Sequence, residues 1–590
     1  MCGIVGYIGD KQAQPILLNC LARMEYRGYD SCGIAVTGGS IKVCKDVKRV
    51  QELTTTMPRI GGLAGIGHTR WATHGEPSQV NAHPHLDCSG NIAVVHNGVI
   101  NNFQKLKQQL VAEGHSFVSQ TDTEVIPHLI EKYYDGNLEE AVETALRDVE
   151  GSYAIIVLAA KEPKLIVARK DSPLIIGVGD RENFIASDVP AVLDYTNRAL
   201  YLEDGDIGIV AKDGIVVKRG GTRVEREEHR ILWSVEDAQK GGYEHFMLKE
   251  IHEQPRVIRD TLGDYTQQNG SASLMDADIK SLLILACGTS YHAALVGKYI
   301  IEDLLNIPVR VELASELNYW APSLAGTGAL AITQSGETAD ILKAMKKLRG
   351  VGCPVLVITN VVGSSASRIA SQTVYTRAGP EISVAATKSF TAQLMVLYWL
   401  AMSYSKADAR RLADMVMGIR QLPNKVQQVL DNKDEIIKSA KYLAGYENAF
   451  FIGRGINFPI ALEGALKLKE ISYIHAEGCA AGELKHGPFA LLGEDIPVIA
   501  IVAQDNTYEA MLTNIREVKA RGAPVIALAE EGDKDIDQLA DSVLTLPKGD
   551  AIFSPVVNTV ALQLLAYYTA RHRGCPIDTP RNLAKSVTVE

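Results

Sequence analysis

The N-terminal stretch Met1-Cys2-Gly3-Ile4-Val5-Gly6-Tyr7-Ile8-Gly9 decides how the first part of this chain folds. Its apolar run predicts a buried strand, which would fix Cys2 at the edge of a sheet. If Met1 is removed, Cys2 carries a thiol nucleophile and a free α-amine. An amine of that kind has a pKa of about 7.7–8.0, so it can accept the thiol proton near neutral pH. A cysteine at position two can also arise by chance, so its meaning depends on the rest of the chain.

The composition is that of an ordinary globular chain of several domains. With 590 residues, 46% of them hydrophobic and 22% charged, we expect about three or four domains. The net charge of −10 is spread along the chain without a Lys/Arg-rich block, so we expect no nucleic-acid partner. The nine cysteines are odd in number and include no Cys-x-x-Cys pair, which argues against a disulfide framework and a structural zinc site.

The N-terminal sequence and the length of the apolar runs indicate in which cellular compartment to expect the protein. No signal peptide precedes Cys2, and no apolar run reaches the roughly 18 residues that a membrane span needs. We therefore expect a cytoplasmic protein with no membrane partner.

Three segments before residue 130 are dense in functional side chains: residues 25–31, 67–75 and 94–98. A thiol that attacks an amide needs hydrogen-bond donors for the developing oxyanion. Asn97 and Gly98, which follow a predicted strand over 92–95, could supply a side-chain amide and a backbone N–H. Arg70 and Asp122 suit the carboxylate and the ammonium group of a free amino acid.

Two plainer interpretations stand beside this one. Charged residues at these spacings could form an ordinary ion-pair network. Five histidines could suggest a metal, but no pair has the His-x-x-x-His spacing of metalloproteases, and we predict no metal. These histidines are His68, His74, His83, His85 and His96, and we expect residues 83–85 to form a loop.

The motifs Cys2-Gly-Ile-Val-Gly, His68-Thr-Arg-Trp-Ala-Thr-His and His96-Asn-Gly resemble the class II, or N-terminal-nucleophile, glutamine amidotransferase family. The resemblance covers roughly residues 2–215 and implies a four-layer αββα sandwich. It implies that Cys2 attacks the side-chain amide of glutamine and that Asn97 and Gly98 form the oxyanion hole. The residues that it implies for the amino-acid head group are Arg70, Thr73, His74 and Asp122. The chain departs slightly from the family pattern at Cys32, where relatives often have alanine.

After residue 280 the chain repeats one order of strands and helices. We expect strands at 281–286, 329–333, 354–359 and 371–376, and again at 449–452, 497–502, 524–528 and 542–546. Strands that alternate with helices imply parallel sheets covered on both faces, and the repetition implies two copies of one α/β domain. Ligands of such sheets bind outside the carboxyl ends of the strands.

Two turns at those carboxyl ends are rich in glycine and hydroxyl groups: Cys287-Gly288-Thr289-Ser290 and Gln334-Ser335-Gly336-Glu337-Thr338. Each opens a predicted helix, whose N-terminus attracts a phosphate, although Ser and Thr could simply cap the helix. This half resembles the sugar isomerase (SIS) fold in two copies, as doubly wound parallel sheets. The positions that this resemblance implies for the phosphosugar are Cys287, Gly288, Thr289, Ser290, Thr333, Gln334, Ser335, Thr338 and the backbone of Val384. Ala386 stands where relatives often have a serine that contacts the sugar.

The second repeat and the C-terminus carry further ionisable groups. Glu463, Lys467 and Glu470 share one face of a predicted helix over 461–472, where exposed ion pairs would be the plain interpretation. Lys585 lies in an apolar context near the C-terminus. There it could lose its proton and attack a ketone, or it could be a surface lysine of a mobile end.

The whole chain, from Cys2 to Glu590, resembles a family of isomerising aminotransferases that use L-glutamine and fructose 6-phosphate. The resemblance implies that His486 helps open the sugar ring and that Lys585 forms a Schiff base with the C2 ketone. Glu470 would move a proton between C1 and C2, with support from Lys467 and Glu463, and Trp71 would gate a channel for ammonia. The family also implies a homodimer, with His486 acting in the partner's site, and no metal or organic cofactor.

The expected domains are an amidotransferase domain over 2–218, a linker over 219–242, SIS domains over 276–412 and 440–580, and a catalytic tail over 581–590. Two rival functions stay open. One is a purine-pathway phosphoribosyl amidotransferase with a similar first third, against which the paired phosphosugar domains argue. The other is a phosphosugar-sensing regulator, against which the intact Cys2 and the ionisable groups of the second repeat argue.

Overall fold

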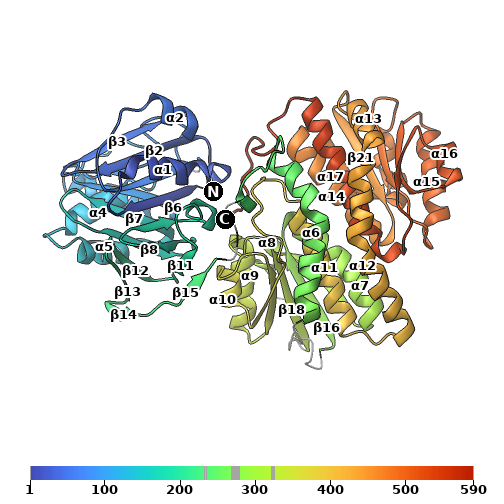
Figure 1. The fold of residues 1–590 in the computed structure, drawn as a ribbon, viewed down its shortest axis with the longest axis horizontal. Helices are drawn as coiled ribbons and strands as arrows, with labels where there is room; N and C mark the ends of the chain where they lie inside the picture. Colours follow the sequence, from blue (N-terminus) through green and yellow to red (C-terminus); the bar gives the residue numbers. More distant parts are fainter. Residues whose placement is uncertain are drawn as a thin grey trace. The chain divides into compact units, whose positions relative to one another are not determined.

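The computed structural model of the chain describes residues 2–72, 74–231, 233, 236–267, 279–320, 324 and 326–588. The chain divides into two compact units (Figure 1). The first unit comprises Met1–Ala238, Glu337–Ala339 and Ala584–Glu590. The second comprises Gln239–Gly336 and Asp340–Leu583.

The first unit contains two antiparallel sheets. One has eight strands in the order β15-β11-β9-β10-β1-β4-β2-β3, and the other has seven in the order β14-β13-β12-β8-β7-β6-β5. The strands of the first sheet are β1 (Gly3–Ile8), β2 (Ser31–Thr37), β3 (Ile41–Asp46), β4 (Ala64–Arg70), β9 (Ile175–Val178), β10 (Asn183–Ala186), β11 (Arg198–Tyr201) and β15 (Glu228–Arg230). Those of the second are β5 (His85–Leu86), β6 (Ile92–Ile100), β7 (Gly151–Ala159), β8 (Leu165–Lys170), β12 (Asp206–Ala211), β13 (Gly214–Arg219) and β14 (Thr222–Val224).

The two sheets face each other across one apolar core, to which β1 contributes Ile4 and Ile8 and β7 contributes Ile156 and Leu158. The outer face of the seven-stranded sheet is covered by α3 (Phe103–Ala112), α4 (Val125–Tyr133) and α5 (Leu138–Arg147). Against the eight-stranded sheet pack α1 (Ala13–Ala22) and α2 (Val50–Thr56). The predicted αββα sandwich is therefore confirmed.

Three local predictions in this unit need correction. β6 does not end near Val95 but runs to Ile100, so Asn97 and Gly98 lie inside a paired strand, opposite Ala154 and Tyr153. The expected linker contains β14 and β15, which pair with β13 and β11. His85 begins β5 instead of lying in a loop. In each case a polar or glycine-containing stretch is paired because a neighbouring strand offers it a partner.

The second unit contains two five-stranded parallel sheets with the same strand order, β17-β16-β18-β19-β20 and β22-β21-β23-β24-β25. This order confirms two copies of one doubly wound fold. The strands are β16 (Ser281–Ala286), β17 (Val309–Leu313), β18 (Thr327–Thr333), β19 (Val355–Thr359), β20 (Gln372–Tyr375), β21 (Asn448–Gly453), β22 (His475–Ala480), β23 (Val498–Ile501), β24 (Val525–Glu530) and β25 (Ser542–Leu546). β17 and β22 are not among the strands predicted from the sequence. Both are edge strands with exposed and half-buried residues, so neither carries a continuous apolar run.

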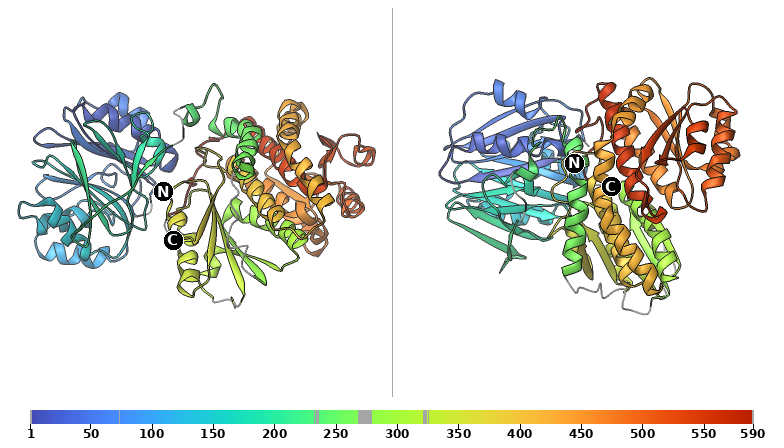
Figure 2. Two further views of the ribbon diagram at one scale, coloured as in Figure 1. Left: turned by 60° about the horizontal axis from the view of Figure 1, so that its bottom comes forward. Right: turned by 45° about the vertical axis from the view of Figure 1, so that its right-hand side comes forward.

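Helices of both repeats share one core in the second unit. The green helix α6 packs against α11 and against α12 (Figure 2). The helices of this core are α6 (Phe246–Gln267), α7 (Gly288–Leu305), α11 (Lys388–Ser403), α12 (Ala409–Asp431), α13 (Asp434–Leu443), α14 (Phe458–Ser472) and α17 (Ser554–His572). The remaining α-helices of the unit are α8 (Ala314–Leu317), α9 (Ala339–Gly350), α10 (Ser365–Ile369), α15 (Tyr508–Lys519) and α16 (Lys534–Leu539). Short 3₁₀ turns are η1 (Glu25–Arg27), η2 (Val189–Ala191), η3 (Glu236–Ala238), η5 (Gly455–Asn457), η6 (Ala481–His486), η7 (Pro488–Leu491) and η8 (Ala551–Phe553).

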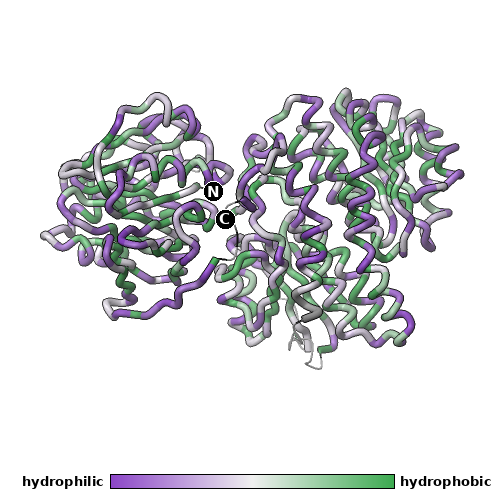
Figure 3. Tube along the Cα trace, viewed as in Figure 1, coloured by the Kyte–Doolittle hydropathy of each residue, from purple (hydrophilic) through white to green (hydrophobic). Residues whose placement is uncertain are grey.

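One helical stretch departs from the expectation that no apolar run is long enough to cross a membrane. An 18-residue window within Ala551–His572 reaches a mean hydropathy of 1.3, and 83% of that window is buried inside the chain. A helix that is apolar on all sides is typical of a protein core as well as of a membrane span. Figure 3 shows that apolar residues also follow the central strands of each unit.

Candidate active sites

The pairing of β1 with β4 positions Cys2. Gly3 lies opposite Thr69, so Cys2 lies beside the end of β4 and the residues that follow it. The backbone N–H of Trp71 donates a hydrogen bond to Cys2 Sγ over 3.2 Å. Burial raises the pKa of the Cys2 thiol above its ordinary value, so this thiol needs a base before it can react as a thiolate.

Asn97 of β6 lies next to Cys2, because its Nδ2 donates to the Cys2 carbonyl over 2.9 Å. The following residue, Gly98, has a φ of +137°, and a Cβ there would lie 2.0 Å from the Ser152 carbonyl oxygen. Only glycine fits this backbone. The strand therefore carries one side-chain amide and one adjacent backbone N–H next to residue Cys2. Two donors on a fixed strand are what an oxyanion hole requires.

Arg70 and Asp122 are both buried, with 3% and 4% of their surface exposed. Nη2 of Arg70 donates to the carbonyls of Gly75, over 2.9 Å, and of His74. Oδ2 of Asp122 accepts from the backbone N–H of Ile100 over 2.8 Å. Both charged groups are thus held by backbone groups. His74 is half-buried, and Thr73 lies outside the described residues.

The sequence analysis assigned no role to Asp30, which the structure shows holding the loop after β4. Its Oδ2 accepts from the backbone N–H of Ala72 over 2.8 Å, next to Trp71. The only signal in the sequence was its place in the segment 25–31.

Four of the five histidines considered above as metal ligands are buried, namely His68, His83, His85 and His96. Burial lowers the pKa of His68 and of His83 well below the ordinary value, so their imidazoles stay neutral. Their rings stack with centroids 4.0 Å apart. These side chains are therefore packed groups in the interior of the first unit.

In the second unit, Glu463, Lys467 and Glu470 do not form a solvated helix face. Glu463 and Lys467 are at most 1% exposed. Lys467 Nζ lies 2.5 Å from Glu470 Oε2 and 3.5 Å from Glu463 Oε1. Burial by itself lowers the pKa of Lys467, but Glu470 and Glu463 together outweigh it and hold the pKa above its ordinary value. The lysine is therefore a fixed cation beside the half-buried Glu470 carboxylate.

The first repeat contributes two side chains to the same cluster. Lys467 Nζ donates to Thr289 Oγ1 over 3.0 Å, and this hydroxyl donates to Glu463 Oε1 over 3.1 Å. His292, which the sequence analysis missed, places Nδ1 2.7 Å from Glu463 Oε2. Thr289 and His292 lie on α7, whereas the charged residues lie on α14, so the cluster joins the two repeats.

The two glycine- and hydroxyl-rich turns lie at one sheet edge, because β16 and β18 are parallel neighbours. Strand order reverses between these two strands, which is where doubly wound sheets bind ligands. Cys287 is the N-cap of α7, and Gly288 has a φ of +54°. Ser290 accepts from Gln393 Nε2 over 3.0 Å.

In the second of these turns, Thr333 Oγ1 accepts from the backbone N–H of Gly336 over 3.2 Å, while Gln334 and Ser335 are half-buried. Thr338 immediately precedes α9. The backbone N–H of Val384 is used by the Asp578 carbonyl, at 3.1 Å. Ala386 cannot supply the serine contact to the sugar that relatives often have. If the backbone of Val384 contacts the sugar instead, it does so through its carbonyl oxygen.

Two further residues predicted to act on the sugar are His486 and Lys585. His486, at the end of η6, is exposed, and among the described residues it makes no hydrogen bond to that cluster. Lys585 is half-buried, and the next residue, Ser586, is only 8% exposed. The chain end up to Thr588 is therefore not a fully solvated tail.

Comparison with known proteins finds matches in both units of the chain. A model of the glutamine amidotransferase domain matches residues 68–194, and a model of the SIS domain matches residues 277–403 and 442–573. A solved structure titled as the C-terminal domain of glucosamine-fructose-6-phosphate aminotransferase from Francisella tularensis is 38% identical. It aligns with a TM-score of 0.55 and covers 58% of this chain and 100% of that one.

Several curated relatives match from end to end, and two of them serve as examples. Both are named glutamine--fructose-6-phosphate aminotransferase [isomerizing]. One, from Caldanaerobacter subterraneus subsp. tengcongensis, is 49% identical, and one from Pyrococcus horikoshii is 50% identical. Each alignment covers 100% of both chains. The chain therefore belongs to the isomerising glutamine–fructose-6-phosphate aminotransferase family.

Proposed function

We propose that this protein transfers the amide nitrogen of L-glutamine to fructose 6-phosphate and isomerises the product, giving glucosamine 6-phosphate and glutamate. The observation that carries the proposal is the buried Thr289–Glu463–Lys467–Glu470 cluster beside the switch point of a phosphosugar-type sheet. The same chain also holds Cys2, whose backbone carbonyl accepts a hydrogen bond from Asn97 Nδ2.

In the proposed first reaction, the α-amine of Cys2, exposed by removal of Met1, takes the thiol proton. The thiolate then attacks the side-chain carbonyl carbon of glutamine, while Asn97 Nδ2 and the Gly98 N–H stabilise the oxyanion. Arg70 pairs with the substrate carboxylate and Asp122 with its ammonium group. By family resemblance, Thr73 and His74 also hold this head group. The C–N bond breaks, ammonia leaves, and water hydrolyses the thioester to glutamate and free Cys2.

In the second reaction, His486 assists opening of the sugar ring and Lys585 condenses with the C2 ketone, releasing water. Ammonia displaces the lysine from C2, and Trp71 gates its passage. Glu470 then takes a proton from C1 and returns one to C2, which converts the 2-imine into the 2-amino aldose. Lys467, 2.5 Å from Glu470 Oε2, stabilises the carboxylate form of this base.

The turns at residues 287–290 and 333–338 hold the phosphate and the sugar hydroxyls. We also propose that the active form is a homodimer in which His486 acts in the partner's site. The reaction needs no organic cofactor and takes place in the cytoplasm.

The test is to incubate purified protein lacking Met1 with glutamine and fructose 6-phosphate and to measure both products by mass spectrometry. We expect glucosamine 6-phosphate and glutamate in equal amounts. The Cys2→Ala variant should make glucosamine 6-phosphate only when ammonia is supplied at high concentration. The absence of product with either nitrogen source in the unaltered protein would contradict the proposal.

A further inference from the structure

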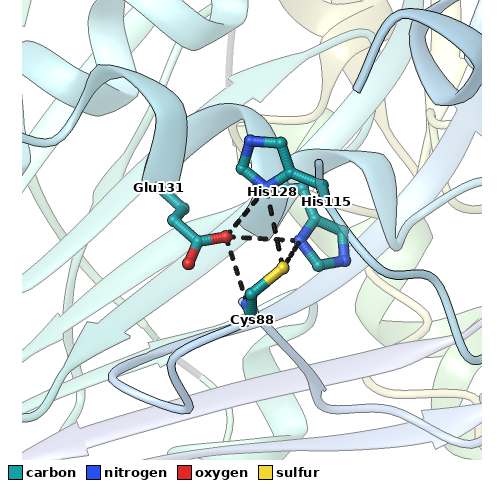
Figure 4. Close-up of side chains that lie close together, drawn as sticks. All are labelled: Cys88, His115, His128 and Glu131. Atoms are coloured by element: carbon teal, nitrogen blue, oxygen red, sulfur yellow. Dashed lines mark hydrogen bonds and ion pairs between the residues drawn. The ribbon is translucent and has the colours of Figure 1, made fainter. Parts of the chain in front are cut away.

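Although the sequence predicts no metal, we propose that Cys88, His115, His128 and Glu131 in the first unit form a zinc-binding site separate from the residues proposed to act on glutamine. Cys88 follows β5, His115 follows α3, and His128 and Glu131 lie three residues apart on α4. Figure 4 shows the four side chains converging on one another from these three segments.

The four ligand atoms lie within 4.8 Å of one another, and most of the separations known individually match those of a tetrahedral shell. Cys88 Sγ lies 3.6 Å from His115 Nδ1 and 3.5 Å from His128 Nδ1, while Glu131 Oε2 lies 2.9 and 3.5 Å from the same nitrogens. Zinc bonds of about 2.3 Å to sulfur and about 2.0–2.1 Å to nitrogen or oxygen place neighbouring ligands roughly 3.3–3.6 Å apart in a tetrahedron. Three of the four separations fall within about 0.1 Å of that range.

Hydrogen bonds alone account poorly for this arrangement. Each Nδ1 faces both the sulfur and the carboxylate oxygen, although an imidazole nitrogen carries at most one proton. A cation instead accepts a lone pair from all four atoms at once. One thiolate, two imidazoles and one carboxylate are a donor set that zinc binds, and four protein ligands give the closed shell of a structural site.

The surroundings hold these ligands in place. His128 is 1% exposed, and its Nε2 is buried without a hydrogen-bond partner among the described residues, with Glu124 Oε1 3.9 Å away. Histidines that bind metals by one nitrogen commonly direct the other toward a carboxylate. The backbone N–H of Ser116 donates to Cys88 Sγ over 3.4 Å, and that of Cys88 donates to Glu131 Oε2 over 3.1 Å.

The consequence of such a site is mechanical. The ion would tie the loop after β5 and the loop after α3 to helix α4. Asp122, proposed above to bind the glutamine ammonium group, lies three residues before this helix. The ligands themselves are distinct from the residues proposed to act on glutamine, so the site would stabilise the domain without taking part in catalysis.

The test uses full-length protein purified without chelators, with Cys88→Ser and His115→Ala as site variants and Cys44→Ser as the matched control. Cys44 is a half-buried cysteine of β3 that is not part of the cluster. Metal content is measured by elemental analysis. After chelation and reloading with Co²⁺, absorption spectra are recorded for a thiolate-to-cobalt charge-transfer band and for the d–d bands of tetrahedral cobalt.

We expect about one zinc per chain in the unaltered protein and in Cys44→Ser, and a loss of at least tenfold in both site variants. Added zinc should raise the melting temperature of chelated protein, but not that of the site variants. The cobalt bands should appear in the unaltered protein and in Cys44→Ser only. If the unaltered protein retains no zinc, and neither zinc nor cobalt changes its melting temperature or spectrum, the four residues are a hydrogen-bonded cluster and the proposal is wrong.

Discussion

A lysine with no exposed surface, such as Lys467, needs groups that replace the water it loses on folding. Thr289, Glu463 and Glu470 provide them, from two helices that belong to different repeats. An unpaired buried ammonium group would be strongly unfavourable, so the cluster is stable only while all its members are present. A single substitution within it is therefore expected to change chemistry and local structure together, and only conservative variants are informative.

Glu470→Gln keeps the size of the side chain but removes the base proposed to move the sugar proton. Loss of a general acid–base group typically costs about 10²–10⁴-fold in rate. We expect a fall of that size in kcat for glucosamine 6-phosphate, while glutamine hydrolysis at Cys2 stays within twofold of the unaltered enzyme. Glu477→Gln, at an exposed position of β22, is the control and should match the unaltered enzyme in both assays. Unchanged synthesis in Glu470→Gln would remove Glu470 from the mechanism.

Gly98→Ala tests the strand beside Cys2. An alanine there would be strained at a φ of +137° and would place its Cβ 2.0 Å from the Ser152 carbonyl oxygen, so β6 must shift. We expect glutamine hydrolysis to fall at least tenfold, while ammonia-dependent synthesis is retained. Gly90→Ala, also at positive φ but with nothing within 4 Å of the added Cβ, is the control. Equal losses of hydrolysis in both variants would show that the donor at residue 98 has no special role.

At the scale of elements, β12 of the seven-stranded sheet carries a buried carboxylate that fixes the end of the β13 hairpin. Asp206 has no exposed surface, and it pairs with Arg226 over 2.7 Å and with Arg219 over 2.8 Å. Burial alone would raise the pKa of Asp206, but hydrogen bonds from Arg226, from the Glu203 N–H and from Arg219 outweigh it and hold the pKa below its ordinary value. The ion pairs therefore stabilise the ionised form, and with it the folded sheet.

Asp206→Asn should reduce the stability of the first unit by about 1.5–3 kcal/mol at pH 7, as expected for lost hydrogen bonds to charged groups. Because the folded pKa is depressed, this contribution is fully present above the unfolded value of about 3.9, and it is lost as pH falls through the lower folded pKa. Calorimetric melts should show a smaller difference in stability between the unaltered protein and Asp206→Asn at pH 3 than at pH 7. Asp213→Asn, at an exposed position, is the control and should be as stable as the unaltered protein at both pH values. If Asp206→Asn lowers stability equally at both pH values, packing and not charge is responsible for the stabilisation by Asp206.

At the scale of the whole molecule, the proposed dimer makes a prediction that one chain cannot test. If His486 acts in the partner's site, a chain with His486→Ala and a chain with Lys585→Ala are each inactive in sugar synthesis. A mixed dimer of the two contains one site with both groups intact. Random pairing of co-expressed chains should then restore roughly a quarter of the unaltered activity, since half of the dimers are mixed and each has one working site of two.

The restored activity is measured as glutamine-dependent formation of glucosamine 6-phosphate, with each variant expressed alone as the control. If His486 acts within its own chain, both sites of the mixed dimer lack one group and no activity returns. Either variant being active alone would show that its residue is not required.

The order of strands and helices could be predicted from the sequence wherever the apolar runs are continuous. The Ser281–Ala286 and Ser542–Leu546 strands were predicted with the bounds that the structure has. The edge strands β17 and β22 were missed because half of an edge strand faces solvent, so its pattern resembles a loop. Motif residues such as Cys2 and Asn97 were found because they cluster in short segments.

The sequence by itself determined the class of each domain, the internal repeat and the family, because periodic burial and short motifs are local properties of the chain. Only the tertiary structure decided that His292 reaches Glu463 across two repeats, and that Cys88, His115 and Glu131 converge. Those contacts join residues from separate segments, brought together only by helix packing and strand pairing. No spacing rule along the chain encodes a contact of that kind, because its distance is set by the fold.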